Sequence, residues 1–417
     1  MTGNGIVIAG GSQAAVQFAG SLRELGYADP ITIIDDTHHL PYQRPPLSKD
    51  FLAGEVDVDG LRFRLVEWYE KNDVTVVLGS AVVGARREGD HGVATTADGA
   101  QFPYDRLAIA VGAAPRRLEI EGSDLAGLHY LRDADDADRL KSELDSTDDV
   151  VVIGGGFIGL EVAAGSLKRG KTVTVLEAAP RIIGRAVGEE TSEWFLQAHR
   201  KHGMDIRTNA KITRFVGSAG RVTGVEIDDG TVIPAGVVVI GIGVIPRTEL
   251  AEQLGLEVNN GIVVDENSVA SDGSTIAIGD VANLPNPYHR TREAMARIRL
   301  ESVNNAVEQA KSAAAAVVGA PNAYESVPWF WSNQGELRLQ MAGLNMGFDR
   351  TVWRGDPDAE KFAILYYRGD VLLGADCVNN PVDFMAVKRA LGAGQNIPAE
   401  AAAGGEPLKK LVVDLVG

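Results

Sequence analysis

Short apolar runs alternate with amphipathic stretches along this chain, and the alternation predicts an α/β protein. The runs at 6–9 (Ile-Val-Ile-Ala) and 31–34 (Ile-Thr-Ile-Ile) have the length and the branched residues of buried strands. The stretch between them, to about Leu25, has the apolar spacing of a helix. A strand, a helix and a second strand in this order form a βαβ unit with parallel strands.

The same plan returns later in the chain. Apolar runs at 150–153 and 172–176 flank a helical stretch that ends near Arg169. Both halves also close on a strand that is followed by glycine, proline and arginine, beginning at Gly112 in the first half and at Gly243 in the second. The sequence therefore contains an internal repeat, which predicts two related domains.

The rest of the pattern completes the domain organisation. Strand-rich stretches fill 74–111 and 211–239, and a long helix is expected from about Arg297 to Val318. Aromatic and alternating strand patterns then follow at 329–331, 337–342, 362–367 and 371–377. We expect an α/β fold with two Rossmann-like domains, 1–113 plus 246–320 and 114–245, and a small α+β carboxy-terminal domain at 321–417.

Each predicted βαβ unit carries a glycine-rich turn between its first strand and its helix. The second turn reads Gly154-Gly-Gly156-Phe-Ile158-Gly159, with all three glycines of the dinucleotide-binding pattern G-x-G-x-x-G. These glycines allow a tight turn, a close approach of backbone to a pyrophosphate, and close packing of helix on strand. The first turn, Gly10-Gly-Ser-Gln-Ala-Ala15, has serine and alanine at the second and third glycine positions. Two such turns suggest two bound dinucleotides and electron transfer between them.

An acidic residue follows the second strand of each unit, where a carboxylate can accept hydrogen bonds from a ribose hydroxyl. Glu177 has this place in the second unit, and its charge favours NAD over NADP because it repels a 2′-phosphate. Arg185 follows closely and is expected to contact cofactor phosphates. In the first unit Asp36, or else Asp35, occupies the corresponding position.

Composition narrows the classes of partner. The net charge of −17 argues against nucleic acid, which requires a basic surface. The single cysteine, Cys377, excludes a C-x-x-C redox pair and is expected to be a buried apolar residue. No metal site is expected. We find neither a signal peptide nor an apolar run of about 20 residues that would span a membrane, so a cytoplasmic location without membrane contact is expected.

Several motifs together resemble the NADH-dependent ferredoxin reductases of bacterial oxygenase systems, which have a glutathione-reductase-like flavoprotein fold. The most specific is Arg44-Pro-Pro-Leu-Ser-Lys49, followed by Phe-Leu. The others are Gly112 to Arg116, Gly154 to Glu161, Ile278-Gly-Asp280, Arg299-Leu-Glu-Ser302 and Pro328-Trp-Phe-Trp-Ser-Asn-Gln334. The resemblance covers nearly the whole chain and implies that the first domain binds FAD and the second binds NADH.

The resemblance also implies individual roles. Lys49 would lie beside the flavin ring near N5 and pair with Glu161, so these two residues are the catalytic candidates. Asp280 would bond a ribityl hydroxyl of FAD, with a helix cap as the alternative. The remaining implied FAD contacts are Gly10, Ser12, Ala14, Asp36, Arg44, Val82, Ala113, Arg132, Ile298 and Trp331, with Trp329 as an alternative to Trp331. The expected NAD contacts are Gly154, Gly156, Ile158, Gly159, Glu177, Arg185 and Gly243.

Three positions depart from the family pattern. Ser12 and Ala15 stand where the family usually has glycine, and Asn333 stands where it commonly has aspartate. None of these changes removes a charge that the implied chemistry requires. They bear on the affinity for FAD and on the flavin potential.

The sequence-based hypothesis is a flavoprotein that takes hydride from NADH and passes single electrons to a [2Fe-2S] ferredoxin. That ferredoxin would serve a cytochrome P450 or a Rieske-type ring-hydroxylating oxygenase. A rubredoxin reductase and a non-catalytic NADH sensor of the apoptosis-inducing-factor type are the alternatives. Candidate docking cations for the ferredoxin are Arg290, Arg292 and Arg297 near Arg299, and Lys388, Arg389, Lys409 and Lys410 in the carboxy-terminal domain.

Overall fold

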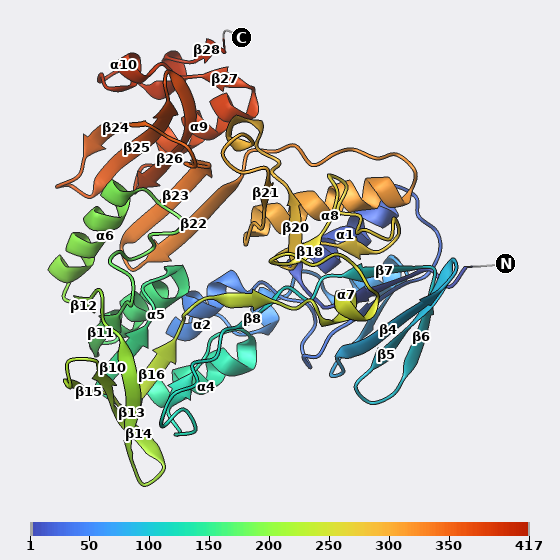
Figure 1. Cartoon of the computed structure of the whole chain (residues 1–417), viewed down its shortest axis with the longest axis horizontal. Coiled ribbons are helices and arrows are strands. Elements are labelled where there is room, and N and C mark those ends of the chain that lie inside the picture. The colour runs from blue at the N-terminus through green and yellow to red at the C-terminus, as the bar shows by residue number, and fades with distance from the viewer. Residues whose placement is uncertain (1–2, 416–417) are drawn as a thin grey trace. The chain divides into compact units, whose positions relative to one another are not determined.

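The chain folds into two compact units, and the computed structural model describes residues 3–415 of it. The first unit consists of the residues up to Gln43 together with Val58–Ala114 and Pro246–Phe330. The second unit consists of Arg44–Asp57, Pro115–Ile245 and the residues from Trp331 onward. Both units are assembled from segments that are distant in sequence (Figure 1).

A parallel five-stranded sheet forms the centre of the first unit, in the order β19-β7-β1-β2-β3. Its strands are β1 (Ile6–Ala9), β2 (Ile31–Ile34), β3 (Val74–Val77), β7 (Arg106–Ile109) and β19 (Ile276–Ala277). Every residue of β1 is buried, as is typical of a parallel strand covered on both faces. Helices α1 (Gln13–Glu24) and α8 (Val303–Val317) pack side by side through alanines, which allow a close approach.

Smaller elements complete the first unit. An antiparallel three-stranded sheet contains β4 (Val82–Glu88), β5 (His91–Thr96) and β6 (Gln101–Tyr104). A second small sheet contains β18 (Ile262–Val263), β20 (Ala282–Pro285) and β21 (Arg297–Ile298). The short helices are α3 (Val66–Lys71), α7 (Glu249–Gln253) and the 3-10 turns η2 (Asp59–Leu61) and η3 (His289–Thr291). Strands β8 (Ala113–Pro115) and β17 (Val244–Pro246) lie where the chain leaves one unit and enters the other.

The second unit repeats the parallel sheet in the order β12-β11-β10-β16-β9. Its strands are β9 (Leu128–His129), β10 (Asp149–Ile153), β11 (Thr172–Leu176), β12 (Asp205–Arg207) and β16 (Val237–Ile240). Helices α4 (Ala134–Leu144), α5 (Phe157–Lys168) and α6 (Glu189–Lys201) accompany this sheet. The hairpin strands β13 (Ile212–Ser218), β14 (Arg221–Ile227) and β15 (Val232–Pro234) form a separate antiparallel sheet (Figure 1).

The carboxy-terminal part of the second unit is built on another five-stranded sheet, ordered β22-β23-β26-β25-β24. Its strands are β22 (Trp329–Gln334), β23 (Leu337–Gly343), β24 (Arg350–Asp356), β25 (Lys361–Arg368) and β26 (Val371–Val378). Helix α9 (Pro381–Gly392) packs on β23 and β26. The chain then forms β27 (Gln395–Asn396), α10 (Ala399–Ala402), η4 (Leu408–Lys410) and β28 (Val413–Asp414).

The proline-rich segment folds into two short helical turns, η1 (Pro45–Ser48) and α2 (Asp50–Ala53). Leu52 is 2 % exposed and belongs to the same core as Leu160 of α5 and Leu337 of β23. Arg169 at the end of α5 donates a hydrogen bond to the Leu52 carbonyl oxygen at 2.9 Å. The segment that carries Lys49 is therefore fixed inside the second unit.

The structure confirms the α/β class with two parallel sheets and a mixed carboxy-terminal part, and it differs from the predicted elements in two details. The long helix begins at Val303 and not near Arg297, because Ser302 caps it by accepting a hydrogen bond from the Asn305 amide. Strand β24 was not predicted. Residues 44–57, which the sequence placed in the first domain, belong to the second compact unit. The three domain boundaries as such stay a prediction.

A buried polar cluster ties α6 to the carboxy-terminal sheet within the second unit. The Asp376 carboxylate accepts hydrogen bonds from the hydroxyls of Tyr366 and Thr191 (2.8 Å for Thr191). The Tyr366 hydroxyl also accepts a hydrogen bond from the Gly188 amide, just before α6, at 3.0 Å. Burial raises the pKa of Asp376 to about 6, although both hydroxyl hydrogen bonds oppose the rise.

This raised pKa predicts a defined pH dependence of stability. A carboxyl whose pKa is higher in the folded than in the unfolded state stabilises the fold below its unfolded value and loses that contribution as pH rises through about 6. We expect the free energy of unfolding of the wild type, relative to Asp376→Asn, to fall by on the order of 3 kcal/mol between pH 4 and 7. Urea unfolding of both proteins across this range measures it. A difference that is independent of pH would contradict the assignment.

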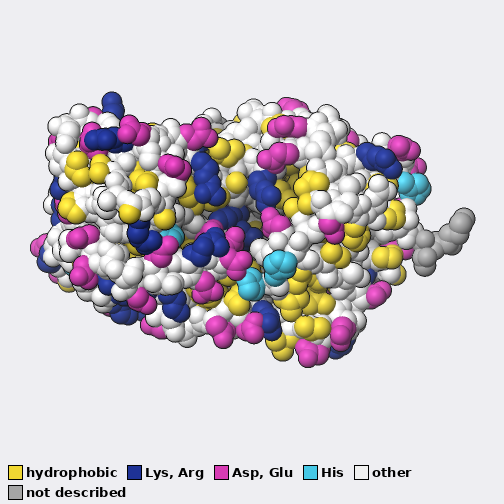
Figure 2. Space-filling view, turned by 90° about the horizontal axis from the view of Figure 1, so that it is seen from below, with side chains coloured by type: hydrophobic (Ala, Val, Ile, Leu, Met, Phe, Trp, Pro, Cys, Tyr) yellow, Lys and Arg dark blue, Asp and Glu magenta, His cyan; other side chains and the backbone are white. Residues whose placement is uncertain are grey.

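The surface carries charges of both signs. On the face in Figure 2, Lys and Arg side chains are interspersed with Asp and Glu. Between residues 3 and 415, no helix is long and apolar enough to cross a membrane. In the same residues, no group of three or more His, Cys, Asp or Glu side chains is arranged to hold a metal ion.

Candidate functional site

The second glycine turn has the geometry that a bound pyrophosphate requires. Gly154 has φ of +103°, and a Cβ there would stand 2.3 Å from the Gly241 carbonyl oxygen. A Cβ on Gly159 would stand 2.2 Å from the Gly154 carbonyl oxygen, so glycine is required for α5 to lie this close to the turn. A Cβ on Gly156 would meet no described atom within 4 Å. Among the three motif glycines, Gly154, Gly156 and Gly159, only Gly156 therefore has free space beside its backbone that a ligand could occupy.

Helix α5 begins at this opening without a side-chain cap. Its N-cap residue is Gly156, which has no side chain that could cap the helix. The amides of a first helical turn and the positive end of the helix dipole attract an anion. Ile158, in that first turn, is 47 % exposed.

Glu177 lies beside the turn and is held by it. One carboxylate oxygen accepts a hydrogen bond from the Gly155 amide at 2.8 Å, and the other accepts one from the Ala179 amide at 2.7 Å. A carboxylate has about four acceptor positions, so two remain for ribose hydroxyls. Its backbone partners fix its orientation before any ligand binds.

The loop after Glu177 brings further predicted NAD contacts together. The Ile183 amide donates a hydrogen bond to the Gly155 carbonyl oxygen at 2.8 Å, which holds the loop across the turn. Ile183 has φ of +44°, an unfavourable conformation for a branched residue. Arg185 is exposed, and a Cβ on Gly243 would lie 3.4 Å from its Nη2 atom. The predicted NAD residues thus converge on one site.

The first glycine turn has the same backbone with a different middle residue. Gly10 has φ of +101°, and a Cβ there would stand 2.7 Å from the Ala110 carbonyl oxygen. Ser12 occupies the position of Gly156 and is the N-cap of α1, where its hydroxyl accepts a 3.4 Å hydrogen bond from the Ala15 amide. The serine therefore has a structural use that the sequence pattern did not reveal.

The strand register identifies Asp35 as the counterpart of Glu177 in the first unit. Asp35 follows the last residue of β2 as Glu177 follows the last residue of β11, and its carboxylate accepts a 2.7 Å hydrogen bond from the Gly11 amide. Asp36 is exposed and forms an ion pair with Arg247 at 3.5 Å. Asp35 is therefore the structural counterpart of Glu177, although the sequence placed Asp36 first, and which of the two contacts a ribose stays a prediction. A cofactor contact by Asp36 stays a prediction.

The segment that carries Asp280 lies close to the first glycine turn. Gly279 has φ of +81°, and a Cβ there would lie 3.5 Å from that of Ala14 on α1. The Gly279 amide donates a 2.8 Å hydrogen bond to Gln309 of α8. Strand β20 follows Asp280, so this residue caps no helix and the alternative role is wrong. The predicted contacts Gly10, Ser12, Ala14 and Asp280 are therefore neighbours in the first unit.

Lys49 and Glu161 form the ion pair that the family resemblance implied. The Lys49 ammonium lies 2.7 Å from Glu161 Oε2, with side-chain exposures of 15 % and 4 %. Ser48 donates a hydrogen bond to the same oxygen at 2.5 Å, and Ser332 of β22 donates one to Oε1 at 2.7 Å. Both serines were missed from the sequence, because nothing local marks a partner 113 or 171 residues away.

The other predicted FAD contacts are divided between the two units. Val82 begins β4, Ala113 is buried in β8, and Ile298 pairs with Leu284 in the first unit. Arg44, Arg132 and Trp331 belong to the second unit, and each is partly buried. Their contacts with a cofactor stay predictions.

The geometry of both glycine turns fits a bound dinucleotide. Each has a glycine where a Cβ would strike a carbonyl oxygen, a helix that starts at the turn, and a carboxylate held by a turn amide. The first unit adds the Gly279 turn beside α1. These residues fit a dinucleotide pyrophosphate and ribose in each unit.

One of the three predicted docking arginines lies below the surface: Arg290 is 4 % exposed, which contradicts a docking role for it. Arg297 is half-buried, and its guanidinium donates hydrogen bonds to the carbonyl oxygens of Val264 and Asn283, both at 2.6 Å. A docking role for Arg297 stays a prediction. Arg292 is exposed and pairs with Glu325 at 2.9 Å. Its docking role stays a prediction.

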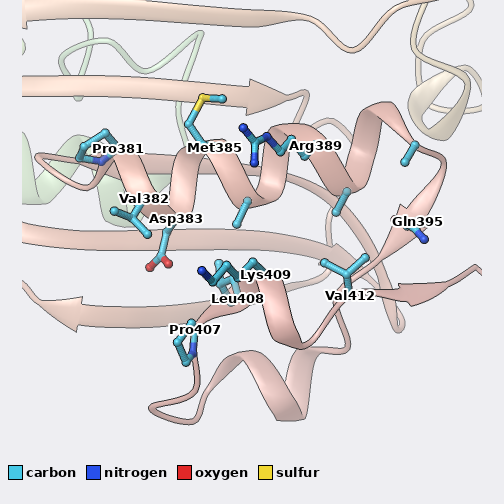
Figure 3. Close-up of a pocket in the computed structure, with 13 residues that line it drawn as sticks. Pro381, Val382, Asp383, Met385, Arg389, Gln395, Pro407, Leu408, Lys409 and Val412 are labelled. Atoms are coloured by element: carbon cyan, nitrogen blue, oxygen red, sulfur yellow. The ribbon is translucent and has the colours of Figure 1, made fainter.

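An apolar pocket with a cationic rim lies in the carboxy-terminal part (Figure 3). It is about 590 Å³ in volume and is formed by α9 and the η4 segment. Val382 is 70 % exposed and Met385 is 40 % exposed. Arg389 and Lys409 are exposed beside them, whereas the nearby Asp383 is neutralised by Arg354 at 3.0 Å. The local charge is positive although the chain as a whole is acidic.

Cys377 is buried in β26, as the sequence predicted. Burial raises the pKa of its thiol well above the ordinary value, which makes it a poor nucleophile at neutral pH. No thiol in residues 3–415 is therefore accessible to a substrate.

The chain belongs to the pyridine nucleotide-disulphide oxidoreductase family, whose model matches residues 4–310. A second model, described as the reductase C-terminal domain, matches residues 329–412. Rhodocoxin reductase of Rhodococcus erythropolis is 43 % identical over 95 % of this chain and 92 % of its own. The ferredoxin reductase for the CYP199A2 system of Rhodopseudomonas palustris has a similar structure, with a TM-score of 0.92, 37 % identity and coverage of 98 % and 99 % of the two chains. The reductase in a covalent putidaredoxin reductase–putidaredoxin complex also has a TM-score of 0.92, with 36 % identity and coverage of 98 % and 97 %.

Alanine substitution at two glycines separates folding from binding. Gly159→Ala would place a Cβ 2.2 Å from a carbonyl oxygen, so we expect a loss of roughly 1–3 kcal/mol in stability. Gly156→Ala meets no described atom and is expected to change stability by less than about 1 kcal/mol. If a pyrophosphate approaches Gly156, this variant still weakens NADH binding by about tenfold. Thermal unfolding and NADH titration measure both effects, and wild-type affinity in Gly156→Ala would refute the placement.

Proposed function

We propose that this chain is an FAD-dependent ferredoxin reductase that takes hydride from NADH and delivers single electrons to a [2Fe-2S] ferredoxin. The ferredoxin in turn would serve a cytochrome P450 or a ring-hydroxylating oxygenase. The observation that carries the proposal is the presence of two glycine turns with dinucleotide-binding geometry in one chain. A solved relative that covers 98 % of the chain is named as the ferredoxin reductase for the CYP199A2 system.

In this proposal each cofactor is bound by its own set of residues. When bound, FAD supplies the acceptance of a hydride and the release of electrons one at a time. The Gly10 turn, Asp35 and Asp280 hold it in the first unit. The Gly154 turn, Glu177 and Arg185 bind NADH in the second unit. Lys49 holds a positive charge for the flavin site, and Glu161 fixes that charge in place. We also propose a cytoplasmic location, where NADH is produced.

A direct experiment tests the function. The purified chain is expected to show flavin absorption bands, to be bleached by NADH without oxygen, and then to reduce a [2Fe-2S] ferredoxin over many turnovers. Faster reduction of rubredoxin than of ferredoxin would indicate the rubredoxin-reductase alternative. A long-lived reduced state without turnover on either acceptor would indicate a sensor and would overturn the enzymatic proposal.

Nicotinamide specificity is tested at Glu177. The carboxylate accepts hydrogen bonds from ribose hydroxyls and repels a 2′-phosphate, so Glu177→Gln is expected to weaken NADH binding about tenfold and to reduce the preference over NADPH. Asp228→Asn, an equal charge change at an exposed turn of the same unit, is the control. Steady-state kcat/KM for both nucleotides gives the ratio. An unchanged ratio in Glu177→Gln would exclude Glu177 as the specificity determinant.

We propose that the cationic pocket at α9 and η4 is the ferredoxin docking surface. Exposed apolar side chains flanked by Arg389 and Lys409 suit an acidic protein partner. Asp383 does not cancel this charge because Arg354 neutralises it. The net charge of −17 does not prevent an acidic partner from docking here, because docking depends on the charges near the interface.

Charge reversal tests this surface. In Arg389→Glu and Lys409→Glu we expect the KM for ferredoxin to rise about tenfold, while NADH-dependent ferricyanide reduction stays within about twofold. Lys211→Glu, an exposed site on the hairpin sheet, is the matched control. A selective effect of Arg292→Glu would move docking to that arginine. Equal loss with both acceptors would indicate a folding defect and would overturn the docking role.

A further inference from the structure

The two carboxylate oxygens of Glu161 have separate sets of partners. Oε2 faces Lys49 and Ser48, whereas Oε1 accepts only the Ser332 hydroxyl among the hydrogen bonds of the described residues. Glu161 is 5 % exposed and Ser332 is fully buried. The proposed function uses the Oε2 side alone and gives no reason for a buried donor on the other side.

A chain of buried polar groups continues from Ser332 away from Lys49. The Gln334 side-chain amide donates to the Ser332 hydroxyl at 3.1 Å, and Gln334 Oε1 lies 2.6 Å from Nε2 of His199 on α6. All three residues are at most 1 % exposed. Ser332 and Gln334 are two positions apart on β22 and face the same side, while Asn333 between them is exposed.

The direction of every bond in this chain follows from donor and acceptor chemistry. The Glu161 carboxylate can only accept, so the single proton of Ser332 is directed to it. The Ser332 oxygen must then accept, which requires the NH₂ group of Gln334 on that side. The Gln334 oxygen therefore faces His199 and must accept the proton of Nε2. Each donor thus points toward Glu161.

His199 can hold this orientation because it stays neutral. Burial lowers the pKa of its imidazole to about 4, and the Gln334 hydrogen bond opposes that shift only in part. Its Nδ1 atom is buried and has no hydrogen-bond partner among residues 3–415. A neutral ring with its proton on Nε2 is the form that this environment favours.

We propose that Ser332, Gln334 and His199 are positioning residues that form a one-way hydrogen-bond relay ending on Glu161. Aligned hydrogen bonds polarise one another, and this polarisation stabilises the negative charge on the carboxylate. That charge in turn holds the Lys49 ammonium at 2.7 Å. The donors on the Oε1 side offset part of the carboxylate's negative charge, so less of it cancels the Lys49 ammonium. This consequence for the flavin rests on the proposed function.

The relay predicts a change in flavin energetics when it is cut. Ser332→Ala removes the donor on Oε1, which leaves the site more negative and disfavours the reduced flavin. We expect about a tenfold smaller equilibrium constant for flavin reduction by NADH, equivalent to about 30 mV more negative for a two-electron couple. Ser332→Thr keeps the hydroxyl and is expected to restore the wild-type potential. Ser218→Ala, an equivalent change at an exposed serine that ends β13 in the same unit, is the control and is expected to leave the flavin potential unchanged.

Nitrogen-15 NMR of the His199 ring provides a readout that is independent of turnover and of ferredoxin. In wild-type protein we expect a neutral ring with its proton on Nε2 from pH 5.5 to 8, and in Gln334→Leu a mixture of tautomers. A proton on Nδ1, or a charged ring at pH 7, would overturn the relay even if the chain reduces ferredoxin. An unchanged flavin potential in folded Ser332→Ala would also overturn it. Failure of ferredoxin reduction with the expected tautomer and potential would count against the proposed function alone.

Discussion

The burial of the Glu161 carboxylate imposes the strongest constraint on the second unit. A carboxylate that is 5 % exposed on the apolar helix α5 requires a cation and hydrogen-bond donors within reach, because an unpaired buried charge costs several kcal/mol. The chain meets this requirement from two distant segments: the proline-rich segment supplies Ser48 at the end of η1 and Lys49 directly after it, and β22 supplies Ser332. The proline-rich turn and the carboxy-terminal sheet are thereby fixed to the helix that carries the NAD-binding turn.

The two glycine turns show how one backbone serves two kinds of helix start. At Gly156 no side chain caps the helix, and a Cβ would meet no described atom within 4 Å, so a ligand can approach the backbone of the turn closely. At Ser12 the corresponding position caps its own helix. The imperfect glycine pattern of the first turn thus reflects a stabilising cap, and it leaves the positive φ of Gly10 and the Gly11–Asp35 contact intact. A substitution that looks like a degraded motif can keep the essential geometry of the site.

Sequence patterns predicted the strands of the two parallel sheets best. The strands at 6–9, 31–34 and 172–176 were placed to the residue, because parallel strands covered on both faces appear as short runs rich in Val, Ile, Leu and Thr. The start of α8 was misplaced because its boundary depends on one capping serine. Asp36 was preferred to Asp35 because the sequence does not show which carboxylate turns back to the glycine amide. Lys49 and Glu161 could be paired only by resemblance. Ser332 and Gln334 stand in a motif of that resemblance, but their contacts with Glu161 and His199 could not be predicted, since these contacts exist only after the strands and helices have packed.

Lys49 and Glu161 form a mutually dependent buried pair that organises the second unit. A double-mutant cycle on the free energy of unfolding, with Lys49→Met, Glu161→Gln and the double variant, tests this dependence most directly. Each single change leaves a buried polar group without its partner, so the account predicts a coupling of at least about 2 kcal/mol, with the double variant more stable than the sum of the single effects implies. Additive effects, with a coupling below about 0.5 kcal/mol, would contradict the account.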